Sequence, residues 1–129
     1  MNEAITMQQL ELSGQLYMLF QRSASAYRDY LEGGKTYFFA RILRTYNNAT
    51  RELLLEKGYL LSEELQQDAL ALITHYDIWM EKWDDLETRM KPAPNDEFVF
   101  PNDHVFPKNA ASNLEREYQR LKQHLLAGE

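Results

Sequence analysis

Cysteine is missing from this chain of 129 residues. Its absence excludes a disulfide framework, a thiolate metal site and a cysteine nucleophile, and it is typical of proteins from a reducing compartment. No apolar run approaches the ~18 residues that a membrane-spanning helix needs. The first residues, MNEAITMQQLELSG, also lack the basic and then apolar order of a secretory signal. We therefore expect a soluble, cytoplasmic protein with no membrane partner.

Positive charge is also scarce. The chain has 14 Lys and Arg against 20 Asp and Glu, which gives an acidic protein with a net charge of −6. Affinity for nucleic acid depends mainly on clustered Lys and Arg, so we expect no DNA partner. The charge is uneven, because residues 33–58 hold five basic and two acidic side chains, whereas residues 59–90 hold two basic and eight acidic ones. This asymmetry predicts neighbouring helices that attract each other across their shared boundary.

Proline and glycine are rare and confined to a few places. All four prolines lie between positions 92 and 107, and Gly33, Gly34 and Gly58 each follow an apolar pattern of helical spacing. Both residue types end or interrupt helices. They divide the chain into four expected helices and one proline-rich connection, at about 3–32, 35–57, 62–90 and 109–126, with the connection at 91–108.

The third expected helix has the clearest pattern. Ser62 precedes Glu63 and Glu64, the order of an N-cap residue followed by acidic residues that the helix dipole favours. From Leu65 to Met90 apolar residues alternate spacings of four and three, as in a helix that packs against its neighbours at a shallow angle. A comparable stripe on the first expected helix comprises Leu10, Tyr17, Phe20, Ala24, Tyr27 and Leu31. Both stripes predict buried faces.

These patterns predict an all-α fold, a four-helix bundle formed by residues 1–129 as a single domain. The two short connections make the first three helices an up-down-up array. Ser112 and Glu115 have the spacing of a capping box, so the fourth, shorter helix is expected to begin near Asn109 or Ser112. The 18 residues of the proline-rich connection can span the whole third helix. The direction of the fourth helix therefore stays open.

No metal or cofactor motif stands out in the sequence. A di-iron bundle needs Glu three residues before an inward-facing His, and none of the three histidines has one. Two His residues one helical turn apart, as in zinc proteases, are also missing. Asp96, Glu97, Asp103 and His104 share the connection, but loops beside prolines are rich in acidic residues for local backbone bonding. We expect no metal and no cofactor.

Two classes of helical enzymes share fragments of pattern with the chain. Glu81, Asp84 and Glu87 resemble half of the acidic Mg²⁺ site of all-α nucleotide pyrophosphohydrolases, but the paired Glu-x-x-Glu motif of those enzymes has no counterpart. Helical ribonucleases of the HEPN class need four to six residues between Arg and His, whereas the arginines before His124 leave three and seven. Neither resemblance is specific enough to transfer residues, and no catalytic site is identifiable.

An arginine stripe on the second expected helix is the best candidate for ligand binding. Arg41, Arg44, Asn48 and Arg51 lie at i, i+3, i+7 and i+10, so they share one face. Arginine forms paired hydrogen bonds with phosphate, and His75 would add an imidazole if it lay nearby. The competing interpretation, which we favour, is that the stripe pairs with acidic side chains of the third helix.

The stretch FVFPNDHVFP, residues 98–107, places apolar side chains in a proline-bounded loop. Pro101, Asn102 and Asp103 suit a turn between two short extended arms. In the favoured interpretation, the phenylalanines close the open part of a bundle whose fourth helix is short. In the other, the stiff segment docks on a partner at a low entropy cost. The candidate interface residues are Phe98, Phe100, Phe106, Trp79 and Trp83.

The chain is rich in aromatic residues, with eight Tyr, six Phe and two Trp, and such residues are enriched at protein interfaces. Together with the failed catalytic templates, this favours a helical protein that acts through protein–protein contacts, with a protein partner or a second copy as its ligand. The alternative is a nucleotide- or RNA-binding or processing protein that uses the arginine stripe. We regard an enzyme as the less favoured class.

Overall fold

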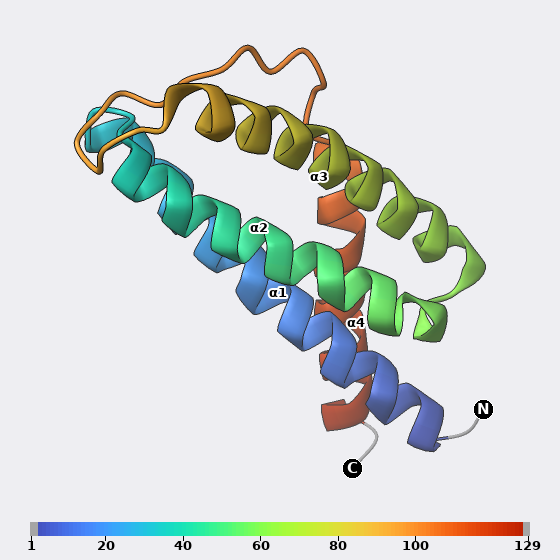
Figure 1. Cartoon of the computed structure of the whole chain (residues 1–129). Helices are drawn as coiled ribbons and strands as arrows, with labels where there is room; N and C mark the ends of the chain where they lie inside the picture. The colour runs from blue at the N-terminus through green and yellow to red at the C-terminus, as the bar shows by residue number, and fades with distance from the viewer. Residues whose placement is uncertain (1–2, 128–129) are drawn as a thin grey trace.

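A computed structural model describes residues 3–127 and contains four α-helices (Figure 1). The helices are α1 (Glu3–Glu32), α2 (Tyr37–Lys57), α3 (Glu63–Met90) and α4 (Lys108–Ala127), and a 3-10 turn, Gly58–Leu60, joins α2 to α3. The predicted all-α four-helix bundle is confirmed, and α1, α2 and α3 alternate in direction (Figure 1). No helix within the described range is long and apolar enough to span a bilayer.

The ends of the helices follow the local sequence. Gly34 ends the turn after α1 with φ +84°, a left-handed conformation that glycine adopts without steric cost. Ser62 is the N-cap of α3, as predicted, and its hydroxyl accepts a hydrogen bond from the backbone N–H of Leu65 at 3.4 Å. At the other end of α3, Lys91 has φ 45°, and Pro92 prevents the helix from continuing.

α2 begins at Tyr37, two residues later than the sequence predicts, because the preceding backbone bonds to the connection (residues 91–107). The N–H of Phe98 donates to the carbonyl of Lys35 at 2.8 Å, and Thr36 forms an isolated antiparallel bridge with Glu97. The connection is thereby fixed to the turn between α1 and α2, at the end of the bundle where α3 finishes.

α4 begins at Lys108, directly after Pro107. The predicted capping box is wrong, because Ser112 and Glu115 both lie inside the helix, in its second turn. The early start is consistent with proline stopping the extended chain just before the helix. As a result α4 is one turn longer at its N-terminus than the capping signal suggests.

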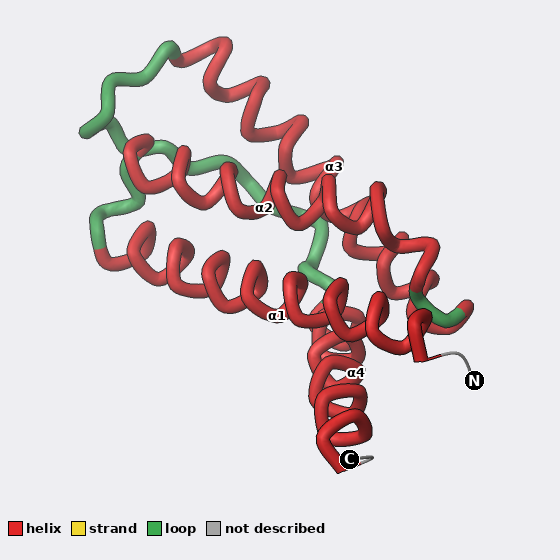
Figure 2. Tube along the Cα trace, turned by 90° about the horizontal axis from the view of Figure 1, so that it is seen from below, coloured by secondary structure: helices red, strands yellow, loops and turns green. Residues whose placement is uncertain are grey.

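α4 runs antiparallel to α1 and covers only part of it. Near the start of α4, Gln21 donates to Glu115 at 3.3 Å, and one turn later the rings of Tyr17 and Tyr118 lie 5.0 Å apart. Tyr118 also contacts Gly14, where an added Cβ would meet the ring at 3.2 Å. α4 crosses the other helices at a steep angle, and its C-terminal end points away from them (Figure 2). The second half of α1 therefore has no fourth helix beside it.

The core consists of two clusters arranged along the bundle. The first cluster lies between all four helices, and its most buried members are Leu16, Leu54, Leu72 and Leu114. The second cluster lies between α1, α2, α3 and the connection, and its members are Ala26, Ala40, Leu43, Trp79, Met80, Trp83 and Phe98. Where α4 is missing, the connection thus supplies the apolar side chains.

The connection closes the bundle mainly through its phenylalanines. Phe98 is only 1% exposed, and its ring centroid lies 5.3 Å from that of Tyr37 and 4.9 Å from that of Trp83. The ring centroid of Phe100 lies 5.9 Å from that of Trp79, one turn before Trp83 on α3. The favoured interpretation of this loop as a structural closure is confirmed for Phe98.

The shape of the connection differs from the predicted hairpin. The turn lies at Pro94–Asn95, whereas residues 101–103 form no turn. The extended backbone at 96–98 bonds to the residues before α2 rather than to a second arm of the connection. The physical reason is that burial of Phe98 fixes the path of the chain along α3, which leaves no room for the two arms to pair.

Candidate functional site

Two of the three arginines on the predicted stripe form ion pairs with α3. The Arg44 Nε and Nη2 atoms donate to the two carboxylate oxygens of Asp84 at 3.1 and 3.3 Å. Arg51 pairs with Asp77 across the same helix boundary and with Glu52 on its own helix at 2.9 Å. The predicted attraction between the basic second helix and the acidic third helix is confirmed by these pairs. A ligand phosphate would have to compete with carboxylates that already occupy the guanidinium groups.

The other members of the stripe do not complete a phosphate clamp. Arg41 is exposed, and its guanidinium carbon lies over the rings of Tyr37 at 5.0 Å and Phe38 at 5.9 Å. Asn48 is half-buried on the same helix. His75 lines a cavity on another side of α3, away from the shallow hollow that Arg41 borders. The structure therefore does not bring the imidazole and the arginines together.

The acidic run on α3 is occupied by structural contacts. Asp84 accepts from Arg44, and Glu87 accepts a hydrogen bond from the hydroxyl of Tyr37 at 2.5 Å. This bond is the main cause that raises the pKa of Tyr37 above its ordinary value. Glu81 is exposed and lies three residues before Asp84 on the helix. Within residues 3–127, no three His, Cys, Asp or Glu side chains come together in a way that could hold a metal ion.

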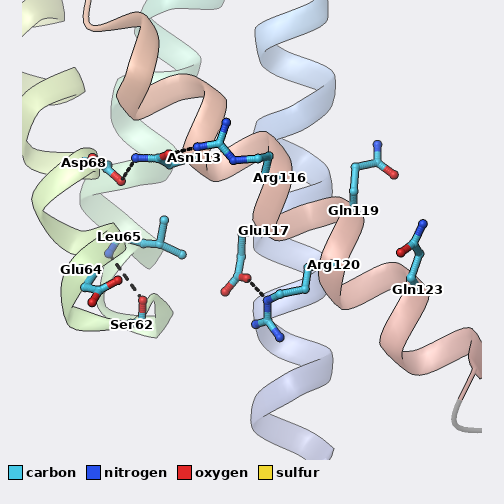
Figure 3. A pocket seen from close by; sticks show the side chains of 10 residues that line it. All are labelled: Ser62, Glu64, Leu65, Asp68, Asn113, Arg116, Glu117, Gln119, Arg120 and Gln123. Atoms are coloured by element: carbon cyan, nitrogen blue, oxygen red, sulfur yellow. Dashed lines mark hydrogen bonds and ion pairs between the residues drawn. The ribbon is translucent and has the colours of Figure 1, made fainter.

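A large polar cleft of about 920 Å³ opens between the start of α3 and α4 (Figure 3). Most of its charged side chains have partners within the cleft. Asn113 donates to Asp68 at 3.0 Å and also accepts from Arg116, while Arg120 pairs with Glu117 at 2.6 Å (Figure 3). These bonds engage four of the five charged side chains that line the cleft, and a ligand would have to compete with them.

A second hollow follows the half of α1 that α4 leaves uncovered. It consists of two adjoining cavities of about 600 and 180 Å³ that share Tyr27, Leu43, Trp79 and Asn102. We call it the α1 groove. Its apolar lining comes from all four helices and the connection, and includes Tyr27, Leu31, Leu43, Trp79, Trp83, Phe98, Val99, Phe100, Phe106 and Ala111. All five predicted interface residues therefore line it.

The α1 groove exists because α4 packs beside the first part of the apolar stripe of α1, where Gln21 meets Glu115, and leaves the last turns of the stripe uncovered. Tyr17 on this stripe is covered by Tyr118, but Tyr27 is 51% and Leu31 is 44% exposed. The expectation that the whole stripe is buried is therefore wrong in its last two turns. Val99, on the opposite wall of the groove, is exposed as well. An apolar strip of this kind on a protein surface is typical of a contact site.

Two polar atoms beside the groove are buried without a hydrogen-bond partner within the described part of the chain. They are the hydroxyl of Ser23 and the indole N–H of Trp83. Both residues line the α1 groove. Leaving such a group unpaired costs about 1–3 kcal/mol.

His75 and His104 connect α3 to the connection at the edge of the groove. Their Nδ1 atoms lie 3.0 Å apart, and the ring of Phe106 packs against that of His75 with its centroid at 5.2 Å. Burial, and secondarily the nearby His104, lowers the pKa of His75 from 6.5 to about 4. Lys82 adds a further bond by donating to the carbonyl of Pro101 at 3.3 Å.

Sequence reasoning missed the exposure of two apolar residues and one contact, because each depends on a segment far away in the chain. Tyr27 and Leu31 are exposed because of where α4 begins, and His104 meets a histidine 29 residues before it. The apolar stripe of α1 was the signal for Tyr27 and Leu31, whereas the spacing of residues in the sequence gives no signal for the histidine pair.

Comparison with known proteins adds no assignment, since no protein-family model, curated protein or solved structure matches this chain.

Proposed function

We propose that this chain is a non-catalytic helical binding module that acts through protein–protein contacts, and that the α1 groove is its contact surface. The observation that carries the proposal is the strip of exposed apolar side chains around the groove, Tyr27, Leu31 and Val99. Water contact with such a strip is unfavourable by roughly 25 cal/mol per Å². A partner that covers it gains this energy.

The occupant we propose is a second copy of the chain. A two-fold interface uses the same patch on both subunits, so it needs a recess and a projection on one face. The α1 groove supplies the recess. The adjacent connection supplies the projection, since Val105 beside Phe106 is 81% exposed. Aromatic side chains such as Tyr27, with few rotatable bonds, are well suited to the centre of such a contact.

The alternative function, nucleotide or RNA binding, has less support. It relies on the arginine stripe, but Arg44 and Arg51 already pair with Asp84 and Asp77. An enzymatic function would need convergent polar groups around a reacting atom, and the best-formed hollow is lined mainly by apolar residues. The lack of cysteine agrees with a cytoplasmic location, which forms part of the proposal.

Self-association can be tested by light scattering over a wide range of protein concentration. The wild-type chain is expected to form a dimer as the concentration rises. Tyr27→Glu and Leu31→Glu each place a charge in the groove and should leave a monomer. The matched control is Met18→Glu on the same helix. Met18 is 65% exposed and lies on the side of α1 opposite Tyr27, so this variant should dimerise like the wild type.

Circular dichroism of every variant establishes that it is folded, because all three positions are on the surface of α1. The proposal is contradicted by a wild-type chain that stays monomeric at every concentration. It is equally contradicted if Met18→Glu abolishes the dimer as completely as the groove variants, since the contact would then lie elsewhere on α1.

A further inference from the structure

His75 and His104 direct the same ring nitrogen toward one point between α3 and the connection. Their Nδ1 atoms are 3.0 Å apart, and the two rings are tilted by 40° with centroids at 5.2 Å. Lys82 also joins α3 to the connection, by donating to the carbonyl of Pro101 at 3.3 Å and by pairing with Asp103 at 3.8 Å. The histidine pair is thus one of the polar links between these two elements.

The separation of the two nitrogen atoms matches that of two ligands on one metal ion. A first-row ion binds imidazole nitrogen at about 2.0–2.1 Å, so two such ligands are about 2.9 Å apart at a right angle and about 3.4 Å apart in a tetrahedron. The observed 3.0 Å falls inside this interval. An ion can thus replace the shared proton with ring movements of only a few tenths of an ångström.

We propose that His75 and His104 form a two-histidine binding site for a divalent transition-metal ion such as Zn²⁺ or Ni²⁺. Imidazole is a preferred ligand for these ions. No third His, Asp or Glu joins the pair within the described residues, so water molecules complete the coordination. The large cavity of the α1 groove, which His75 lines, provides the space for them.

The charges around the pair tolerate a cation. Asp103 lies next to His104 in the chain and forms a weak ion pair with Lys82 at 3.8 Å. Lys108 and Glu115 line the same cavity as His75 and oppose each other in sign. On the buried side, Phe106 and Tyr76 pack around the His75 ring, which holds it in place. A fixed ring loses little freedom when it binds the ion.

Metal binding at this site has a structural consequence. The ion links α3 to a part of the connection 29 residues later, in the segment that closes the second core cluster. An ion that binds only the folded chain raises its stability in proportion to the logarithm of the ion concentration above the dissociation constant. The connection would then be held more firmly over the groove when the metal is present.

The test uses the untagged full chain, freed of metal with EDTA and then dialysed. Isothermal titration with ZnCl₂ or NiCl₂ is expected to give one ion per chain, together with a higher Tm, whereas MgCl₂ should change neither. His104→Gln is expected to abolish both effects. The matched control is His124→Gln, because His124 is exposed on α4 and does not contact the pair. This variant should bind like the wild type.

A second measurement locates the ion independently of stability. Paramagnetic Ni²⁺ should broaden the NMR signals of Phe106 and Tyr76, which surround His75, and leave those of α4 beyond Tyr118 unchanged. The inference is overturned if the wild-type chain binds neither ion, or if His124→Gln loses binding to the same extent as His104→Gln. Broadening confined to the region of His124 would also overturn it.

Discussion

His75 is a buried imidazole, 5% exposed, whose surroundings oppose a positive charge. Burial first, and the neighbouring His104 second, lower its pKa from 6.5 to about 4. In the unfolded chain the ring is free in water and takes up a proton near pH 6.5. Because the folded state binds this proton less readily, stability is complete above pH 6.5 and falls as the pH decreases toward 4.

The predicted loss of unfolding free energy from this residue is at most about 3 kcal/mol between pH 7 and pH 4. Urea denaturation at several pH values, with EDTA present, measures it. Carboxylates add their own pH dependence, so the informative quantity is the difference between the wild type and His75→Gln. The variant should have the shallower slope, and His124→Gln should keep the wild-type slope. Equal slopes in all three proteins would show that His75 does not resist protonation.

The connection contributes to stability mainly through one side chain. Phe98 fills the second core cluster against Tyr37 and Trp83, and its carbonyl accepts a hydrogen bond from Tyr30 at 2.5 Å. We predict that Phe98→Ala lowers the unfolding free energy by about 3–5 kcal/mol, as cavity-forming changes of this size do.

Val105 provides the comparison within the same segment. It is 81% exposed, so Val105→Ala should change the unfolding free energy by less than about 0.5 kcal/mol. Urea denaturation at low protein concentration measures both changes without a contribution from self-association. Similar losses for Phe98→Ala and Val105→Ala would mean that the connection does not close the core in the way its contacts indicate.

At the level of elements, local patterns in the sequence predict the helices and some of their contacts. Ser62 and the residues after it give the correct start of α3, and the charge asymmetry correctly indicates that α2 and α3 are neighbours. The pair Arg44–Asp84 is an instance of this attraction. Such features depend on residues close in sequence or on the sum of many charges. A single sequence contains this information.

Features that depend on where distant segments meet could not be predicted. The stripe of α1 is apolar up to Leu31, but nothing in it reveals that α4 begins at Lys108 and leaves Tyr27 and Leu31 exposed. The spacing of the arginine stripe is compatible with a phosphate site as well as with the favoured ion-pair boundary, and only the structure identifies the partners as Asp84 and Asp77. The approach of His104 to His75 depends on the path of the whole connection.

For the whole molecule, the bundle is best understood as two cores with one shared helix. α4 and Phe106 of the connection close the first core cluster, and Phe98 and Phe100 close the second. The seam of α3 runs through both from Ala69 to Trp83. The α1 groove lies where α4 and the connection meet, and neither of them fully covers α1 there. The proposed contact site therefore results from the position of the fourth helix rather than from a separate binding element.

Two cores that share no buried side chain should respond independently to small changes. Phe98 belongs to the second cluster and Leu114 to the first. We predict that the costs of Phe98→Leu and Leu114→Val add in the double variant to within about 0.5 kcal/mol. Trp83 contacts Phe98 directly, with ring centroids 4.9 Å apart, so Phe98→Leu and Trp83→Phe should deviate from additivity by about 0.5–3 kcal/mol.

Double-mutant cycles from urea denaturation measure both couplings. These conservative substitutions are chosen so that each double variant stays folded, which near-native circular dichroism verifies. A strong coupling between Phe98 and Leu114 would show that the packing of α4 and that of the connection depend on each other. In that case a partner bound in the α1 groove would act on both coverings at once. Additivity means instead that a partner bound in the groove can change the packing of the connection without disturbing α4.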